Sequence, residues 1–514
     1  MAALHTWSGL LAGWVLYFVF VVGTASYFQI SIDRWMSSDE SLARPHERPL
    51  GNVELLNHAQ DWLERHALGA QRWWIRLPDP TGFVGSRDAL LGWQDAGPDG
   101  QWHSLRLDPF DGRLHPAGGE PGGKILRRMH YALHYLPQAT GERLVGICAM
   151  FMLVALLSGI ITHKKIFKEF FTFRPNKGQR SWLDAHNILG VLLLPFLLMI
   201  TYSGFVFFLP EYMPLPFERI YRGDERAYYQ EQGRSSPPTA SGIAAPVVRL
   251  SNQPFAHLGP NEGPPTWIFL YNPGDSAGLI EVRRNRAATD LLMQPTGLYE
   301  AANGRALPSP MAKGPVSRIH DVFIELHVAS FADPTLRWML FASGIGGCAA
   351  IASGLVLWVL KRRQQALRAG QVGFGLRLAE VLNLGTIVGL PLAIAVYFWA
   401  NRLLPEALAG RLEWQVHAMF IAWGLMFGHA ALRERRQAWV EQLTLACPAY
   451  ALLPLLNILT SDRHLGRSLP GGDWQLAGVD LTLLAFGGLF GLVALKLRRR
   501  WYGVVGEQRC EMLP

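Results

Sequence analysis

Histidines stand at the ends of several long apolar segments of this chain, and they fall into two groups. The first group is His5, His163 and His186. The second group is His130, His134, His320 and His327. A polar ring at the edge of hydrocarbon is costly and tends to be functional. Neutral imidazole is a good ligand for iron, and two axial imidazoles make a low-spin haem suited to electron transfer. The pattern therefore predicts two haems b, one at each group.

Within the first group, His5 and His186 form the preferred pair. Each stands four residues before a glycine, Gly9 or Gly190, at the start of an apolar segment. A position that recurs at the edge of two helices suits two ligands of one iron. We therefore expect His5 and His186 to hold one haem iron, with His163 as the remaining candidate.

Within the second group, the choice of ligands stays open. His130 and His134 are four residues apart, and His320 and His327 are seven apart, so each pair shares one face of a helix. Either member of each pair can ligate the second haem. The first choice on each side is His134 or His327.

Two arginines occupy equivalent places where the next apolar segments begin, Arg143 and Arg337. A guanidinium pairs with a carboxylate through two parallel hydrogen bonds, so both residues are candidates for binding haem propionates. Anchoring of the helix ends at the membrane interface is the alternative role.

Other cofactors fit the sequence less well. Few acidic residues lie near the histidines, and no cysteine is close enough for a structural zinc site. The chain has no C-x-x-C-H, so covalently attached haem is not expected. A proton relay built on histidines remains an alternative. Because the chain has neither a dinucleotide-binding nor a Walker sequence, we expect electrons from membrane quinol or a separate cytoplasmic donor.

Two further histidines, His417 and His429, share one apolar segment. They are twelve residues apart, which places them about 120° apart around a helix. We expect structural roles for them, with a part in a quinol pocket as the alternative.

The elements that must position these residues are apolar segments of about 20 residues, the length that crosses the hydrocarbon of a bilayer. Eight segments reach it: 8–29, 143–163, 187–209, 338–360, 379–400, 413–431, 440–460 and 475–497. We therefore expect a mainly α-helical membrane protein with eight transmembrane helices, and the lipid bilayer is its first partner.

Clusters of lysine and arginine follow every second apolar segment. This is the positive-inside pattern, so we expect both termini in the cytoplasm and the long segments 30–142 and 210–337 outside, in a periplasm. The net charge of +8 comes largely from these clusters, so nucleic acid is not an expected partner.

An internal repeat of helix, outer domain and helix organises the first 360 residues. Gly159 and Gly354 recur at matching depth in this repeat and allow close helix approach. Alternating runs such as Trp102–Leu107 and Thr266–Tyr271 predict strands in the outer segments. The expected domains are the first span (1–29), a small α+β outer domain (30–142), two spans with a cytoplasmic loop (143–209), a second α+β outer domain (210–337), the fourth span (338–365) and an appended four-helix module with a cytoplasmic C-terminus (366–514).

Three stretches resemble the PepSY-associated transmembrane helix family, also described as iron-regulated membrane proteins. They are LHTWSG at 4–9, FRPNKGQRSWLDAHNILG at 173–190 and GLVLWVLKRR at 354–363. The resemblance covers about residues 1–365, and the four later spans go beyond it. It implies two PepSY-like periplasmic domains, a four-helix core and b-type haem with histidine ligands.

The same resemblance implies a reductase of the bacterial inner membrane that reduces periplasmic ferric siderophore and releases Fe(II). Two other classes of protein remain open. A non-catalytic regulator with sensory PepSY domains would need no histidine pattern. A permease for siderophore or iron would need interrupted helices and ionisable groups at mid-membrane.

Overall fold

The computed structural model describes residues 2–37, 48–78, 89–97, 100–116, 122–162, 172–175, 177–212, 214–224, 227, 238–252, 262–286, 296–308 and 315–510. The chain forms two compact units. The membrane unit contains Met1–Ser38, Glu120–Phe205 and Thr335–Pro514, and the sheet unit contains Asp39–Gly119 and Val206–Pro334.

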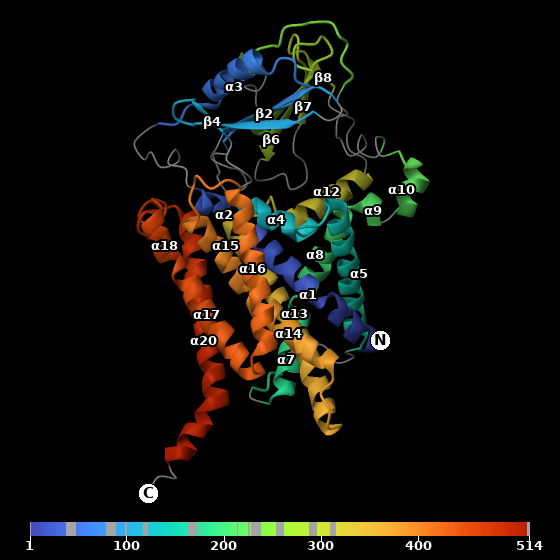
Figure 1. Cartoon of the computed structure of the whole chain (residues 1–514). Coiled ribbons are helices and arrows are strands. Elements are labelled where there is room, and N and C mark those ends of the chain that lie inside the picture. Colours follow the sequence, from blue (N-terminus) through green and yellow to red (C-terminus); the bar gives the residue numbers. More distant parts are fainter. Residues whose placement is uncertain are drawn as a thin grey trace. The chain divides into compact units, whose positions relative to one another are not determined.

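The membrane unit is a bundle of long helices (Figure 1). Its first part contains α1 (Ala2–Ser26), α2 (Gln29–Met36), α4 (Gly122–Ala132), α5 (Gln138–Thr162), α7 (Gln179–Leu192), α8 (Leu194–Phe207) and α13 (Pro334–Arg368). Its second part contains α14 (Phe374–Leu384), a π-helical segment (Gly385–Gly389), α15 (Leu390–Leu403), α16 (Arg411–Leu432), α17 (Arg435–Ala451), α18 (Leu453–Thr460), α19 (Leu465–Ser468) and α20 (Trp474–Cys510).

The expectation of eight transmembrane helices needs correction. Six helices, some of them joined elements, are long and apolar enough to cross a membrane: Ala2–Ser26, Gln138–Thr162, Pro334–Arg368, Phe374–Leu403, Arg435–Thr460 and Trp474–Tyr502. The expected third span is a bent pair, since α7 and α8 meet at 64°. The expected sixth span, α16, is a helix of 22 residues but is not among these candidates. Its polar residues, such as Glu413 and His417, explain why.

The helices after residue 366 share a core with the first part of the membrane unit. Val22 of α1, Trp35 of α2 and Met129 of α4 are fully buried in one cluster with Tyr397 of α15 and Met419 of α16. The appended helices therefore pack against the bundle that carries the histidines.

Hydrogen bonds strengthen this packing. Trp14 of α1 donates from its indole to Asn383 of α14 over 2.9 Å. The hydroxyl of Tyr17 donates to the carbonyl of Ile387 over 3.1 Å, inside the π-helical segment. A π-helical turn leaves carbonyls without their usual helical donor, and Tyr17 supplies one from the neighbouring helix.

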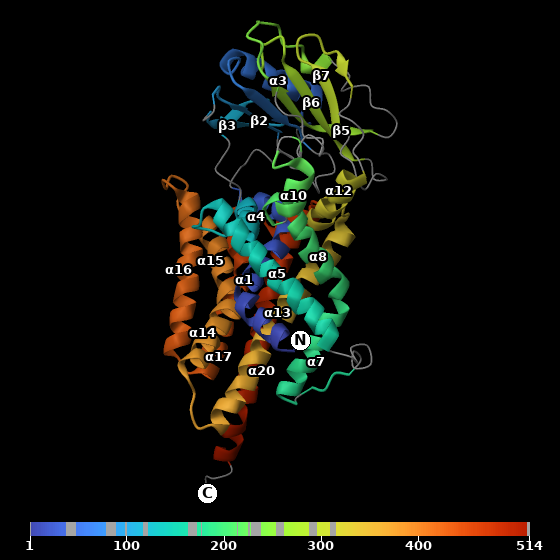
Figure 2. The same cartoon turned by 90° about the vertical axis from the view of Figure 1, so that its right-hand side faces the viewer.

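The sheet unit contains one antiparallel sheet of eight strands, in the order β4-β3-β2-β1-β5-β6-β7-β8 (Figure 2). The strands are β1 (Arg72–Arg76), β2 (Ala89–Gln94), β3 (Trp102–Leu107), β4 (Leu114–Pro116), β5 (Glu262–Tyr271), β6 (Leu279–Arg286), β7 (Thr296–Glu300) and β8 (Ala306–Leu307). The helices α3 (Asn52–His66), α9 (Leu209–Tyr212), α10 (Pro214–Tyr221) and α12 (Pro315–Val328) complete the unit.

The expectation of two separate outer domains is therefore wrong. Each outer segment supplies four strands, and β1 pairs with β5 along its whole length, from Arg72 opposite Tyr271 to Arg76 opposite Trp267. A sheet of four strands exposes unpaired backbone groups at its edges, and joining the two inner edges satisfies both.

One face of the sheet is packed with apolar side chains. Trp73 and Ile75 of β1 and Ile268 of β5 are buried against Leu55 and Leu63 of α3, which lies over this face (Figure 1). Side chains alternate along a strand, so the residues between them point to the other face.

Candidate functional site

The structure brings His5 and His186 together, as the sequence predicts. His5 lies in the first turn of α1 and His186 in the middle of α7, and their ring centres are 6.1 Å apart at an angle of 65°. Two imidazoles bound on opposite sides of one metal ion would have centres about 6 Å apart, because each metal–nitrogen bond is about 2 Å long and each nitrogen lies about 1 Å from its ring centre. The spacing therefore fits two axial ligands of one iron.

Hydrogen bonds fix the orientation of both rings. Nδ1 of His5 lies 2.7 Å from the carbonyl oxygen of Ala155 on α5. Nδ1 of His186 lies 3.0 Å from the carbonyl oxygen of Ala350 on α13 and 3.0 Å from the hydroxyl of Ser353. A carbonyl only accepts, so Nδ1 carries the proton and Nε2 of a neutral ring keeps the lone pair that binds a metal.

A glycine makes room for each ring one helical turn beyond the accepting carbonyl. A Cβ at Gly159 would lie 3.2 Å from Cε1 of His5, and a Cβ at Gly354 would lie 3.2 Å from Cε1 of His186. The sequence assigns these glycines to close helix approach, and the structure shows that they admit imidazole rings. The pattern of a carbonyl acceptor with a glycine four residues later is a signal that sequence reasoning missed.

The same arrangement recurs at His130 of α4. Its ring is buried, and Nδ1 lies 2.8 Å from the carbonyl oxygen of Val19 on α1. A Cβ at Gly23, four residues after Val19, would lie 2.5 Å from Nδ1 of His130. Burial lowers the pKa of His130, which keeps the imidazole neutral.

The two histidine positions lie at different depths of the membrane unit. His5 is near the start of α1, and Val19, which holds His130, is fourteen residues further along. At a rise of 1.5 Å per residue, this spacing is about 21 Å. His5 and His130, one from each expected group, therefore lie at two levels along α1.

His134 has different surroundings from His130. Its half-buried ring stacks on Phe420 of α16, with centres 5.7 Å apart. The next residue, Tyr135, has a left-handed backbone with φ of 63°. Its hydroxyl is hydrogen-bonded to Nδ1 of His417 at 2.5 Å. Burial and the charges of Arg128 and His417 lower the pKa of His134. His417 thus belongs to a cluster with His134, a contact that the spacing of His417 and His429 did not predict.

The remaining candidate ligands are less clearly grouped. In the sheet unit, Nδ1 of His320 lies 3.7 Å from Asp321, and the ring of His327 packs edge-on against Phe207 at 5.4 Å. His163 lies outside the described residues. Where the structure describes the chain, no three His, Cys, Asp or Glu side chains gather as for a metal ion.

The two candidate propionate ligands differ from each other. Arg337 is buried and donates to the carbonyl oxygen of Tyr27 over 3.0 Å. Arg143 is exposed on α5. The equivalence of these arginines in the sequence is therefore not matched by equivalent surroundings.

His429 has a carboxylate partner at the junction of α16 and α17. Its Nε2 lies 2.9 Å from Glu441, which also pairs with Arg433, and its Nδ1 lies 3.3 Å from the amide of Gln442. These contacts join the two helices, in keeping with the structural role expected for His429.

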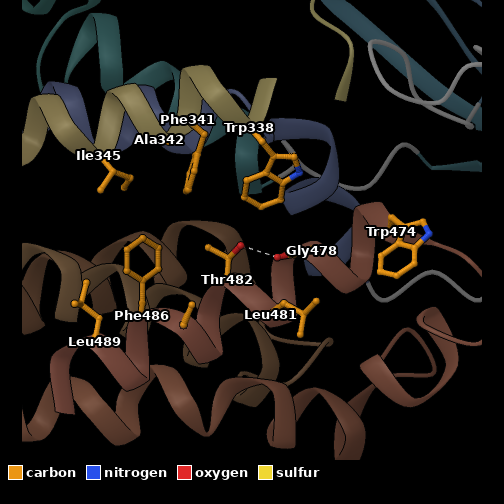
Figure 3. Close-up of a pocket in the computed structure, with 11 residues that line it drawn as sticks. Trp338, Phe341, Ala342, Ile345, Trp474, Gly478, Leu481, Thr482, Phe486 and Leu489 are labelled. Carbon is orange, nitrogen blue, oxygen red and sulfur yellow. Dashed lines mark hydrogen bonds between the residues drawn. The ribbon is translucent and has the colours of Figure 1, made fainter. Parts of the chain in front are cut away.

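A groove of about 600 Å³ lies between α13 and α20 (Figure 3). Its walls are mainly aromatic and aliphatic, and they include Trp338, Phe341, Ile345, Trp474, Phe486 and Leu489. The side chains of the two helices face one another across it, and the hydroxyl of Thr482 is bound to the carbonyl of Gly478 at 2.6 Å. No histidine lines the groove, so its chemistry suits an apolar chain and not a haem iron.

Comparison with known proteins gives a family match whose residue range includes His5, His130 and His186. A family described as the PepSY-associated TM region matches residues 2–361. An uncharacterized protein of Pseudomonas aeruginosa is 27% identical over 383 residues, which cover 70% of this chain and 90% of that protein.

Proposed function

The chain belongs to the family of the PepSY-associated TM region, and from this we propose that it is a haem-containing reductase of the bacterial inner membrane. In this proposal it passes electrons across the membrane to ferric siderophore in the periplasm, where Fe(II) is released. It would serve iron uptake.

The observation that carries the proposal is the 6.1 Å spacing of the His5 and His186 rings, with Nδ1 of each bound to a carbonyl. A regulator or a simple structural pair needs neither the spacing nor the two carbonyls. The glycines beside the rings support the same reading, because a Cβ at Gly159 or Gly354 would lie only 3.2 Å from the imidazole.

In the proposal, His130 is one ligand of the second haem. His130 is the ligand that its surroundings favour over His134, because it shares the carbonyl-and-glycine arrangement of His5 and His186. His134, His320 and His327 are the other candidate ligands that the sequence offers for this haem.

A haem held by His5 and His186 would supply a one-electron relay. The protein's part is to fix each ring and its proton on Nδ1, so that ligation needs no change of tautomer. Each electron delivered converts one Fe(III) of a chelate to Fe(II). Hard oxygen donors hold Fe(II) less firmly, so the metal leaves the chelate.

The electron donor we propose is membrane quinol, with a cytoplasmic donor as the alternative. The apolar groove between α13 and α20 suits the isoprenoid chain of a quinol. The groove also adjoins the turn between α1 and α2, since Phe28 packs on Trp338 at 4.4 Å and on Phe341 at 5.4 Å.

A permease for siderophore or iron is the second candidate. It is favoured by the interrupted helices, the 64° bend between α7 and α8 and the π-helical segment at Gly385–Gly389. In vesicles, a permease would move the chelate across the bilayer, whereas a reductase would produce Fe(II) with the chelate still outside.

The test of the reductase is an optical spectrum of the purified full chain together with an Fe(II) trap. We expect about two haems b per chain and a narrow reduced α-band. We also expect Fe(II) to appear when reduced protein meets a ferric chelate. A haem-free preparation from haem-replete cells would contradict the proposal.

A further inference from the structure

The face of the sheet that α3 does not cover carries a regular pattern of aromatic and arginine side chains. We name it the open face and define it by two adjacent strands, with Arg72, Trp74 and Arg76 on β1 and Tyr271, Phe269 and Trp267 opposite them on β5. The alternating residues Trp73, Ile75, Ile268 and Leu270 are buried under α3. The pleat therefore places all six residues on the side away from α3.

The centre of the open face is an aromatic floor. Gly92 of β2 pairs with Trp74, and a Cβ at Gly92 would lie 2.4 Å from the indole of Trp74. The indole therefore lies across the neighbouring strand and over the glycine. On β5, the rings of Trp267 and Phe269 are parallel within 2°, with centres 5.7 Å apart. The ring centres of Trp74 on β1 and Trp267 on β5 are 5.6 Å apart, so the aromatic rings of the two strands are in contact.

Arginines border the floor at short range. Arg72 lies 4.7 Å from the ring centre of Tyr271 and 5.6 Å from that of Trp102 on β3. Arg76 lies 5.7 Å from the ring of Trp267. Register places Arg106 of β3 on the same face, because Arg106 and Arg76 both pair with Leu90 of β2.

The charge of the open face is unbalanced. Arg283 of β6 is neutralised by Glu281, which it meets at 2.7 Å and which also accepts from the hydroxyl of Tyr271. Arg72 has no such partner. In the part of the chain that the structure describes, no carboxylate pairs with Arg72, and its Nε is buried without an acceptor. A buried guanidinium nitrogen without an acceptor is costly, and an anion seated there would satisfy it.

We propose that the open face binds the anionic, aromatic part of the chelate, so that the protein favours ferric complexes of catecholates or phenolates. This inference rests on the proposed function for the identity of the metal, but the binding surface stands on its own geometry. The aromatic rings of such a ligand would stack on Trp74, and its negative charge would pair with Arg72. A neutral tris-hydroxamate complex offers neither ring nor charge.

The experiment measures binding separately from reduction by using gallium(III), which has the charge of ferric iron and is not reduced. The full chain in detergent is titrated with the gallium tris-catecholate complex and with the neutral gallium tris-acetohydroxamate complex. We expect the catecholate complex to bind at least about tenfold more tightly, the ratio that one good ion pair or stacked ring provides.

Variants locate the site. Arg72→Gln is expected to weaken catecholate binding about tenfold, and Trp74→Leu to weaken it severalfold. Arg65→Gln is the matched control, because Arg65 is an exposed arginine of α3 on the opposite side of the sheet. If Arg72→Gln does not fold, Arg72→Lys keeps the charge but loses the planar fork, and it should still weaken binding.

Two results would overturn the inference: equal affinity for both gallium complexes, or equal effects of Arg72→Gln and Arg65→Gln. Haem content and reduction of a ferric hydroxamate, measured on the same samples, test the proposed function independently. Protein that binds gallium catecholate but lacks haem would refute the reductase and keep the open face as a ligand site. Protein that reduces iron without a catecholate preference would refute the open face alone.

Discussion

The ring of His5 on α1 faces the ring of His186 on α7, with centres 6.1 Å apart and each Nδ1 bound to a carbonyl of another helix. Four helices thus meet at this pair, because the two carbonyls belong to α5 and α13. The position of one ring depends on the packing of all four.

The first prediction concerns the ligands. His5→Ala and His186→Ala should each remove the same single haem, and the double variant should lose no more, because one missing axial ligand already weakens retention. His130→Ala should remove the other haem. Haem content per chain and reduced-minus-oxidised spectra measure this. His417→Ala and His429→Ala are controls that should keep both haems, and retention of both haems in His5→Ala would contradict the assignment.

The second prediction concerns the glycine beside His130. Gly23→Ala should displace the His130 ring, because the added Cβ would lie 2.5 Å from its Nδ1. We expect one haem either to be lost or to show a shifted optical spectrum. Gly9→Ala is the matched control on the same helix, because nothing lies within 4 Å of a Cβ at Gly9. Equal haem content and spectra in the two variants would show that the glycine does not admit the ring.

The third prediction concerns pH. Asp33 of α2, outside the membrane-spanning segments, accepts hydrogen bonds from the backbone amides of Gly123 and Lys124 at 2.6 and 3.2 Å. Burial raises the pKa of Asp33 from 3.8 to about 6, against the smaller lowering effect of these bonds. The folded protein therefore holds this proton more tightly than the unfolded chain does.

The resulting stabilisation is complete below pH 3.8 and is lost as the pH rises through about 6. The free energy of unfolding in detergent should fall between pH 4 and pH 7, by at most about 3 kcal/mol. Asp33→Asn keeps an oxygen acceptor and should flatten this part of the profile. An unchanged slope in the variant would assign the pH dependence to another group.

The fourth prediction concerns topology, which follows from the basic clusters after alternate spans. Reporter fusions at Gly100 and Gly274, both in the sheet unit, should report the periplasm. Fusions at Gln365 and at the C-terminus should report the cytoplasm. A cytoplasmic signal at Gly100 would refute delivery of electrons to an external chelate.

Local patterns in the sequence predicted much of this structure. The strand Trp102–Leu107 has the predicted bounds, and His5 and His186 meet as their repeated spacing suggests. These features depend on neighbouring residues or on a repeat of one motif, which a sequence displays directly.

Features that depend on distant partners were not predicted. The pairing of β1 with β5 joins segments that look like two complete domains, and no local pattern distinguishes one long sheet from two short ones. The carbonyls of Ala155, Ala350 and Val19 belong to the backbone, so their residue types carry no sign that they hold histidines. Only the glycines four residues after these carbonyls can be recognised in the sequence.

The shared sheet also determines the order in which the protein can mature. When the first four strands emerge from the ribosome, β1 is an unpaired edge, and its partner β5 is made roughly 200 residues later, after two more apolar segments. Until then, that edge is open to strands of other chains and to aggregation. Biogenesis therefore requires either slow formation of the first hairpins or a chaperone that shields the edge, a demand that two independent domains would not make.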